Sequence, residues 1–296
     1  VAFERVRTKD GHTFAVKRLT DPAEIFPYLG RNRAYCAYAL CQLEPHRFPY
    51  TRWYLAQGDT GEVLVMHATG SLRGAFLGFG ADLFSMGDPA ALHAILCLHP
   101  GPRFVRVWAQ VEHVSVLKRH FYLFRGDTPV VLRCRTAATF RPIGGPARRL
   151  TGADIDEINR LFRAAGSIGL YRRRFIDSGV WHGVFEDGRL VSVEGTQALS
   201  PTYGVAVVGP TLTHPKFRGR GYAMMTQSAS SREVLEKCSL VMATVDPANT
   251  PALAVNNAAG DGLHTTGFRR DVVGLASLLR RLLAHRRAPA RKEDAV

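Results

Sequence analysis

The sequence predicts an α+β protein in which a mixed sheet is covered by helices on both faces, a three-layer αβα arrangement. Three observations lead to this prediction. Strand-like and helix-like patterns alternate along the 296 residues. Hairpin signals and helix-capping signals recur in both halves of the chain. A Gly144-Gly145-Pro146 segment, which can continue neither a helix nor a central strand, separates two self-sufficient patterns and predicts two domains.

The composition agrees with a globular protein that carries excess positive charge. Lysine and arginine number 39 against 25 acidic residues, a net charge of +14, and 46% of residues are hydrophobic. This excludes a disordered chain. The charge fits either a nucleic-acid-binding protein or an enzyme whose ligand carries several phosphates. No apolar stretch approaches the ~20 residues of a membrane span, and the N-terminus lacks a signal-peptide core. Five dispersed cysteines indicate no disulfide framework and no metal site. We therefore expect a cytoplasmic protein.

The first half begins with a strand and two helices. Asp21 is a helix cap that precedes a proline at the first helical position, and the second helix ends before Pro45. A further helix opens at Asp88, which again precedes a proline. The expected elements of this half are a strand at 13–19, helices from 22 and at 32–43, a hairpin at 51–70, a helix from 89, and strands at 103–111 and 130–140.

The second half reads as helix, hairpin, strand, helix, strand, helix. Asp187-Gly188 is a strong hairpin turn signal. The expected elements are a helix at 155–166 with an apolar stripe, a hairpin at 181–199, a long strand at 204–215, a glycine-rich loop that opens a helix before 238, a strand at 239–246 and a helix at 249–260. We predict an N-terminal α/β domain at 1–143, a second domain at 147–270, and a basic amphipathic helix and tail at 271–296.

The most informative segment is the glycine-rich loop between the long strand and its helix. Consecutive backbone N–H groups at such a turn form an anion site, which the positive end of the helix dipole reinforces. Gly219 and Gly221 allow close approach, Arg218 and Arg220 add charge, and Ala223 keeps the helix start narrow. The segment is neither a P-loop nor a dinucleotide fingerprint. It predicts a pyrophosphate site; the alternative is a strand-to-helix turn with a solvated basic face.

This segment and its surroundings resemble the GNAT superfamily of acyl-CoA-dependent N-acyltransferases. The string from Arg218 to Ala223 matches the family pattern [QR]-x-x-G-x-[GA], and Asn249 with Ala252 matches its downstream N-x-x-A. The resemblance covers residues 150–270, including the hairpin ahead of the long strand. It implies a GNAT-type C-terminal domain preceded by a divergent GNAT-like domain. A glycine-rich segment at 71–81 in the first half does not match the phosphate pattern.

The resemblance implies acetyl-CoA as acyl donor, held in a V-shaped gap between the strand ending at Thr213 and the strand starting near Leu240. Backbone groups of the first strand would pair with the pantetheine arm, and loop amides would hold the pyrophosphate. A strand amide within 209–211 would stabilise the oxyanion. The implied cofactor-binding residues are Leu212, Thr213, Arg218, Gly219, Arg220, Gly221, Tyr222, Ala223 and Asn249.

The sequence departs from the family at two catalytic positions. The usual tyrosine acid is replaced by Asn256, and the frequent strand glutamate falls near the apolar Val207. Glu194, alone in an apolar strand, is the first substitute base; the alternative is a solvated outward glutamate. His214 at the loop entrance is the second, and its alternative is a helix cap or a packing role.

The predicted function is transfer of an acetyl group to a primary amine of a small molecule or peptide, by direct attack in a ternary complex. Holding both reactants together supplies much of the acceleration. A first alternative is a catalytically impaired acyl-CoA sensor or regulatory protein. A second is a nucleic-acid-associated protein that uses the basic tail, although no recognition helix, zinc finger or RNA module is present, so nucleic acid is not an expected partner.

Overall fold

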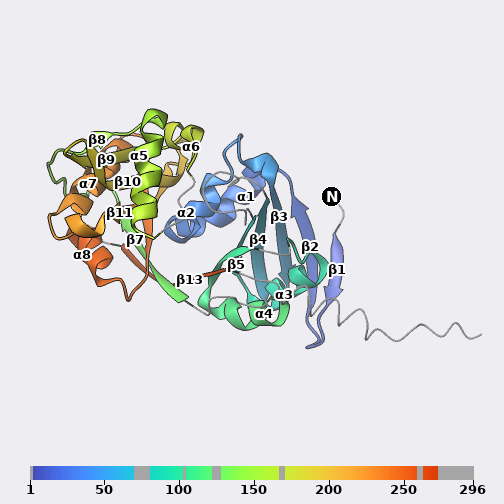
Figure 1. Cartoon of the computed structure of the whole chain (residues 1–296). Helices are drawn as coiled ribbons and strands as arrows, with labels where there is room; N and C mark the ends of the chain where they lie inside the picture. Colours follow the sequence, from blue (N-terminus) through green and yellow to red (C-terminus); the bar gives the residue numbers. More distant parts are fainter. Residues whose placement is uncertain are drawn as a thin grey trace, which may run out of the picture.

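The computed structural model describes residues 3–69, 81–102, 105–121, 128–166, 171–258 and 263–272. These ranges form one mixed sheet of 13 strands with helices on both faces (Figure 1). The predicted three-layer α+β arrangement is confirmed. The strand order is β1-β2-β3-β4-β5-β6-β13-β7-β12-β11-β10-β9-β8.

The first half supplies seven of these strands and the helices α1 to α4. Asp21, Asn32 and Asp88 cap α1, α2 and α3, because each side chain accepts a hydrogen bond from a backbone amide in the first helical turn. The elements are β1 Glu4–Arg7, β2 Thr13–Leu19, α1 Pro22–Leu29, α2 Arg33–Cys41, β3 Thr51–Gly58, β4 Gly61–Thr69, β5 Ala81–Gly87, α3 Pro89–Leu98, β6 Arg106–Gln110, α4 Val114–His120 and β7 Thr128–Arg135. A short 3₁₀ turn, η3, covers Val111–His113.

The second half supplies the other strands and α5 to α8. Asp187 and Gly188 both have positive φ, as the β9–β10 turn requires. The predicted apolar stripe of α5 is buried. The elements are β8 Arg148–Arg149, α5 Ile155–Ala164, α6 Arg173–Asp177, β9 Trp181–Glu186, β10 Arg189–Ser200, β11 Val205–Thr213, α7 Tyr222–Leu235, β12 Leu240–Val245, α8 Thr250–Ala258 and β13 Leu263–Val272, with a 3₁₀ turn η5 at Pro215–Phe217.

The same strand–helix–strand unit occurs in both halves. β5 and β6 are parallel and joined through α3, and β11 and β12 are parallel and joined through α7. Every other strand pair in the described sheet is antiparallel. The N-terminal half therefore repeats the topology of the C-terminal half.

The two halves exchange their last strands. β7, from the first half, pairs with β12 of the second half, while β13, from the second half, lies between β6 and β7. The sequence patterns did not predict β13. The proposed domain boundary at Gly144-Gly145-Pro146 falls in the loop between β7 and β8. Because β7 and β13 each pair with strands of the other half, the assignment of this loop as a domain boundary stays a prediction.

Helix α2 packs across the junction of the two halves (Figure 1). Its buried side chains share one apolar cluster with Trp53 of β3, Trp108 of β6, and Val205 and Val207 of β11. The opposite faces are covered by α3 and α4 in the first half and by α7 in the second. This shared core joins the halves into one packed body. The basic amphipathic helix and tail predicted at 271–296 is wrong at its first two residues, which are the end of β13 because they pair with β6. The rest of that segment and residues 71–80 of the glycine-rich segment lie outside the described residues.

Candidate active site

A cavity of about 760 Å³ lies beside the C-terminal end of β11. β11 and β12 pair only from Val205 with Leu240 to Val208 with Ala243, and beyond this point β11 is paired with β10 alone up to Thr213. The cavity is bounded by the last residues of β11, the glycine-rich loop, the start of α7, and α8. Its lining residues are Thr211, Leu212, Thr213, Phe217, Arg218, Gly219, Gly221, Tyr222, Ala223, Met224, Gln227, Asn249, Pro251, Ala252, Ala254, Val255 and Asn256.

The lining brings together eight of the nine predicted cofactor residues, the exception being Arg220. Gly219 and Gly221 have φ of 79° and 77°, a left-handed conformation that glycine adopts without strain. Gly221 is the N-cap of α7 and makes no side-chain cap hydrogen bond. The first amides of α7 precede any intrahelical bond, so they point toward the cavity end of the helix. Such a helix start is suited to an anion.

Basic side chains surround this helix start. Arg218 and Arg220 are exposed. The Arg218 Nε donates to the Thr213 carbonyl at 3.4 Å, which ties the loop to the strand end. The Arg220 guanidinium lies over the Phe217 ring, 5.0 Å from its centroid. The loop therefore presents positive charge next to the cavity, with Arg218 in the lining and Arg220 stacked on Phe217, which also lines it.

Tyr222, the first residue of α7, is held by a carboxylate from the preceding hairpin. Its hydroxyl donates to Glu186 Oε1 of β9, and this hydrogen bond raises the pKa of the phenol. The contact joins the helix start to the edge of the sheet. It fixes one wall of the cavity near the start of α7.

Asn256 stands where the resemblance leads one to expect a tyrosine, and the structure shows what holds its side chain. It is 4% exposed, and its Oδ1 accepts from Arg135 Nη2 at 2.9 Å. Arg135, at the end of β7, is 1% exposed and also donates to Ser231 of α7 at 2.7 Å. A guanidinium from the first half therefore reaches the inner wall of a cavity in the second half. No sequence signal indicated Arg135, because only the strand exchange brings it there.

Glu194 is fully buried, which overturns the alternative of an outward solvated side chain. Its Oε2 accepts a hydrogen bond from the hydroxyl of Thr211 at 3.1 Å, and its backbone carbonyl accepts one from the hydroxyl of Ser230 in α7 at 3.4 Å. Glu194 does not line the cavity, but Thr211 does. Thr211 is thus a candidate functional residue that the sequence reading had placed only among possible oxyanion amides.

His214 and Val207 contribute to capping and to core packing in this structure. His214 is the N-cap of η5, where its Nδ1 accepts from the Lys216 amide at 3.3 Å, and its ring lies edge-on to Phe217. It is not among the residues that line the cavity. Val207 is fully buried in the cluster beneath α2. The geometry favours the capping role for His214, and its catalytic role stays a prediction.

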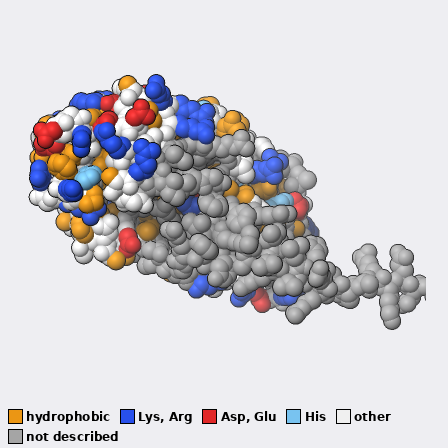
Figure 2. Space-filling view, in the orientation of Figure 1, with side chains coloured by type: hydrophobic (Ala, Val, Ile, Leu, Met, Phe, Trp, Pro, Cys, Tyr) orange, Lys and Arg blue, Asp and Glu red, His pale blue; other side chains and the backbone are white. Residues whose placement is uncertain are grey.

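Lysine and arginine side chains are spread over the visible face of the C-terminal half and are interspersed with acidic ones (Figure 2). They form no continuous stripe on that face.

Among the described residues, no helix combines the length and apolar character that crossing a bilayer requires.

Comparisons with known proteins identify the fold. No family model matches the sequence, and no curated protein matches it. A Drosophila protein solved by structural genomics aligns over 88% of this chain and 99% of its own, at 13% identity and a TM-score of 0.57. A GCN5-related N-acetyltransferase from Kribbella flavida aligns over 71% of this chain and 86% of its own, at 14% identity and a TM-score of 0.51. A tandem GNAT protein from the clavulanic acid biosynthesis pathway aligns over 88% and 97%, at 14% identity and a TM-score of 0.47.

The predicted GNAT-type fold is confirmed. Its parallel strand pair occurs once in each half, which agrees with a GNAT-type C-terminal domain preceded by a divergent GNAT-like one. Identities of 13% and 14% show the fold and not the activity.

Proposed function

We propose that this chain transfers an acetyl group from acetyl-CoA to a primary amine of a small molecule or peptide, by direct attack in a ternary complex. The observation that carries the proposal is the cavity beside β11. There the free end of a parallel strand pair, a left-handed glycine loop and an uncapped helix start converge on one space of about 760 Å³. A cofactor that combines an extended arm with a diphosphate needs this combination of features.

The residues present fit the diphosphate end of such a donor. The α7 amides lack a side-chain cap, and Gly219 has no atom within 4 Å of the place that a Cβ would take, so phosphate oxygens can approach the backbone. Arg218 adds a full positive charge to the wall. Charge-assisted bonds from arginine and backbone amides are the strong form of phosphate recognition. Leu212 and Thr213 offer the adjacent strand edge to the arm, and Asn249 lies opposite.

The donor, when bound, supplies a thioester carbonyl that a neutral amine can attack. An alkylamine is protonated near pH 7, so one proton must leave it before attack. The Thr211 hydroxyl borders the cavity and donates to Glu194 behind it. In our mechanism, the amine's proton passes to the Thr211 oxygen as the hydroxyl proton moves to Glu194. Glu194 would thus be the base, acting through Thr211.

Asn256 bears on a second proton transfer, the protonation of the departing CoA thiolate. An amide has no acidic proton to give to a departing thiolate, unlike the tyrosine found at this position in the family. Its Oδ1 is moreover committed to Arg135. The proposed mechanism therefore contains no protein acid at this position. After attack the nitrogen gives its second proton to solvent water, and the departing thiolate takes its proton from solvent water.

The test measures CoA release by chromatography across a panel of primary amines, together with acetyl-CoA affinity. For Glu194→Gln and Thr211→Val we expect turnover to fall about 10²- to 10⁴-fold, the usual value of a general base, with acetyl-CoA affinity retained. Thr211→Ser keeps the hydroxyl and should retain most of the activity. Equal activity in Thr211→Val and wild type would contradict the relay.

A sensor of acyl-CoA is the second candidate function. The tie between Asn256 and Arg135 and the burial of Val207 favour it, because the structure holds non-catalytic residues at two catalytic positions. Acetyl-CoA binding with no CoA release above the uncatalysed rate, for every amine tested, would establish this alternative and refute the transferase.

A further inference from the structure

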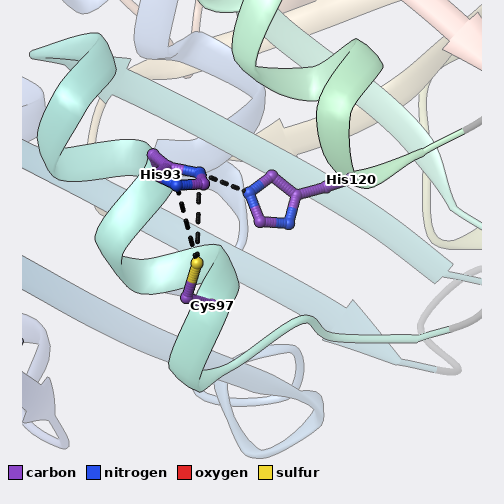
Figure 3. Close-up of side chains that lie close together, drawn as sticks. All are labelled: His93, Cys97 and His120. Atoms are coloured by element: carbon purple, nitrogen blue, oxygen red, sulfur yellow. Dashed lines mark hydrogen bonds between the residues drawn. The ribbon is translucent and has the colours of Figure 1, made fainter. Parts of the chain in front are cut away.

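Two histidines and a cysteine meet on the surface of the N-terminal half. His93 and Cys97 are four residues apart on α3, so they share one face of the helix. His120 is the last residue of α4 and points at them (Figure 3). The His93 Nδ1 lies 2.7 Å from the His120 Nε2 and 3.9 Å from the Cys97 Sγ.

The spacing of these atoms suits one small cation. The three donor atoms all lie within 4.8 Å of one another. Tetrahedral zinc, with bonds of about 2.0–2.1 Å to nitrogen and 2.3 Å to sulfur, places its donors about 3.3–3.6 Å apart. The distances from the His93 Nδ1, 2.7 Å to the His120 Nε2 and 3.9 Å to the Cys97 Sγ, lie on either side of that range. Because no two of the three donor atoms are more than 4.8 Å apart, side-chain movements of about 1 Å would close the site.

The helices that carry the three side chains are rigidly backed. Leu92 and Ile95 of α3 share a buried apolar cluster with Val116 and Leu117 of α4. The cluster fixes the two helices against each other and against the sheet. The donors project from this packed pair, so the site is supported by the core and not by a loop.

The donor chemistry selects the metal. Two imidazoles and a thiol suit zinc, whereas magnesium and calcium take oxygen ligands. Burial, followed by the charge of Arg119, lowers the pKa of His93. Burial raises the pKa of Cys97, and nearby Lys9 opposes this. Lys9 and Arg119 repel cations while Asp10 attracts them, so affinity must come from ligand bonds and not from a charged cluster.

We propose that His93, Cys97 and His120 bind one Zn²⁺ ion, with a fourth coordination position open to water, and that the ion clamps α3 to α4. Three protein ligands plus water is an established zinc arrangement. The site belongs to the half opposite the α7–α8 cavity (Figure 1), and the proposal does not depend on the proposed function. Metal binding requires the thiolate, so Zn²⁺ displaces the Cys97 proton.

Zn²⁺ and Co²⁺ titrations of tag-free, chelator-treated protein test the site. We expect one Zn²⁺ per chain by calorimetry, and a Co²⁺ complex with a sulfur-to-metal absorption band. Cys97→Ser should abolish that band and weaken Zn²⁺ binding at least tenfold, and His120→Gln should weaken it similarly. His12→Ala, at an exposed histidine paired with Asp59, is the matched control and should bind as wild type does. Mg²⁺ should not compete.

A second readout needs no variant. Cys97 is the one exposed cysteine of the five, and all five lie within the described residues. A thiol reagent should therefore modify Cys97 first in the wild-type protein, and saturating Zn²⁺ should slow this reaction at least tenfold. The proposal is overturned by unchanged labelling with Zn²⁺, by equal Zn²⁺ affinity of Cys97→Ser and wild type, or by a loss in His12→Ala as large as that in Cys97→Ser.

Discussion

Gly221→Glu tests the proposed diphosphate site most directly. Gly221 caps α7 with φ of 77° and lines the cavity. A Cβ there would lie 3.7 Å from the Met224 Cε and 3.8 Å from the Met225 Cε, which is ordinary contact. The substitution is therefore sterically tolerated. Two effects of the substitution remain. The side chain strains the left-handed backbone at this position, and the new carboxylate places negative charge beside the start of α7.

The two effects have different magnitudes. A side chain in the left-handed region costs about 1–2 kcal/mol of folding free energy. A carboxylate about 4 Å from a phosphate charge, at an effective dielectric of about 20, opposes binding by about 4 kcal/mol. At about 1.4 kcal/mol per factor of ten, acetyl-CoA affinity should fall about a thousandfold. High salt should restore part of it, because exposed charges are screened.

Calorimetric titration with acetyl-CoA measures the loss, and Gly166→Glu is the matched control. Gly166 has φ of 79°, nothing within 4 Å of its Cβ position, and no place in the cavity lining. It therefore carries the same backbone cost without the charge effect. Wild-type affinity in Gly221→Glu, or an equal loss in both variants, would refute the assignment of the loop.

Three further predictions concern stability. Gly195→Ala places a Cβ 2.1 Å from a ring carbon of the buried Trp181; it should lower the free energy of unfolding by about 1–3 kcal/mol, and an unchanged Tm would contradict this packing. Burial lowers the pKa of His67 to about 4, so the unfolded state takes up a proton near pH 6.5 that the folded state does not. Stability should fall by about 3 kcal/mol from pH 7 to 4 on this account, and urea titrations of His67→Leu should lack that component. Arg135→Met removes the donor to Asn256 and should cost about 3 kcal/mol with weaker acetyl-CoA binding; a loss confined to stability would separate Arg135 from the site.

Local signals predicted most of the elements because their causes are local. Asp21 and Asp88 each cap a helix whose first residue is proline. Asp187 and Gly188 adopt the positive φ that their turn type needs. The glycine loop was recognisable because positive φ at Gly219 and Gly221 favours glycine, and these glycines stand directly before a helix. These features depend on interactions between residues a few positions apart.

The candidate site was only partly predictable for the same reason. Most of the predicted cofactor residues lie in the short segment from Leu212 to Ala223, so their grouping follows from the sequence alone. The link between Thr211 and Glu194 depends on the register of β10 with β11, which places the two opposite each other. Sequence reading therefore left the orientation of Glu194 open, and the structure shows that it is buried against Thr211.

The sequence by itself determined the α+β class, the order of most of the elements and the glycine loop with its helix start, since hydrophobic period, caps and glycines specify local backbone. Only the tertiary structure decided that β7 and β13 change places between the halves. That exchange puts Arg135 on Asn256, 121 positions away. The helices α3 and α4 likewise bring His120 to His93 and Cys97. Contacts of this kind leave no periodic trace, because they arise from the packing of distant segments around a common core.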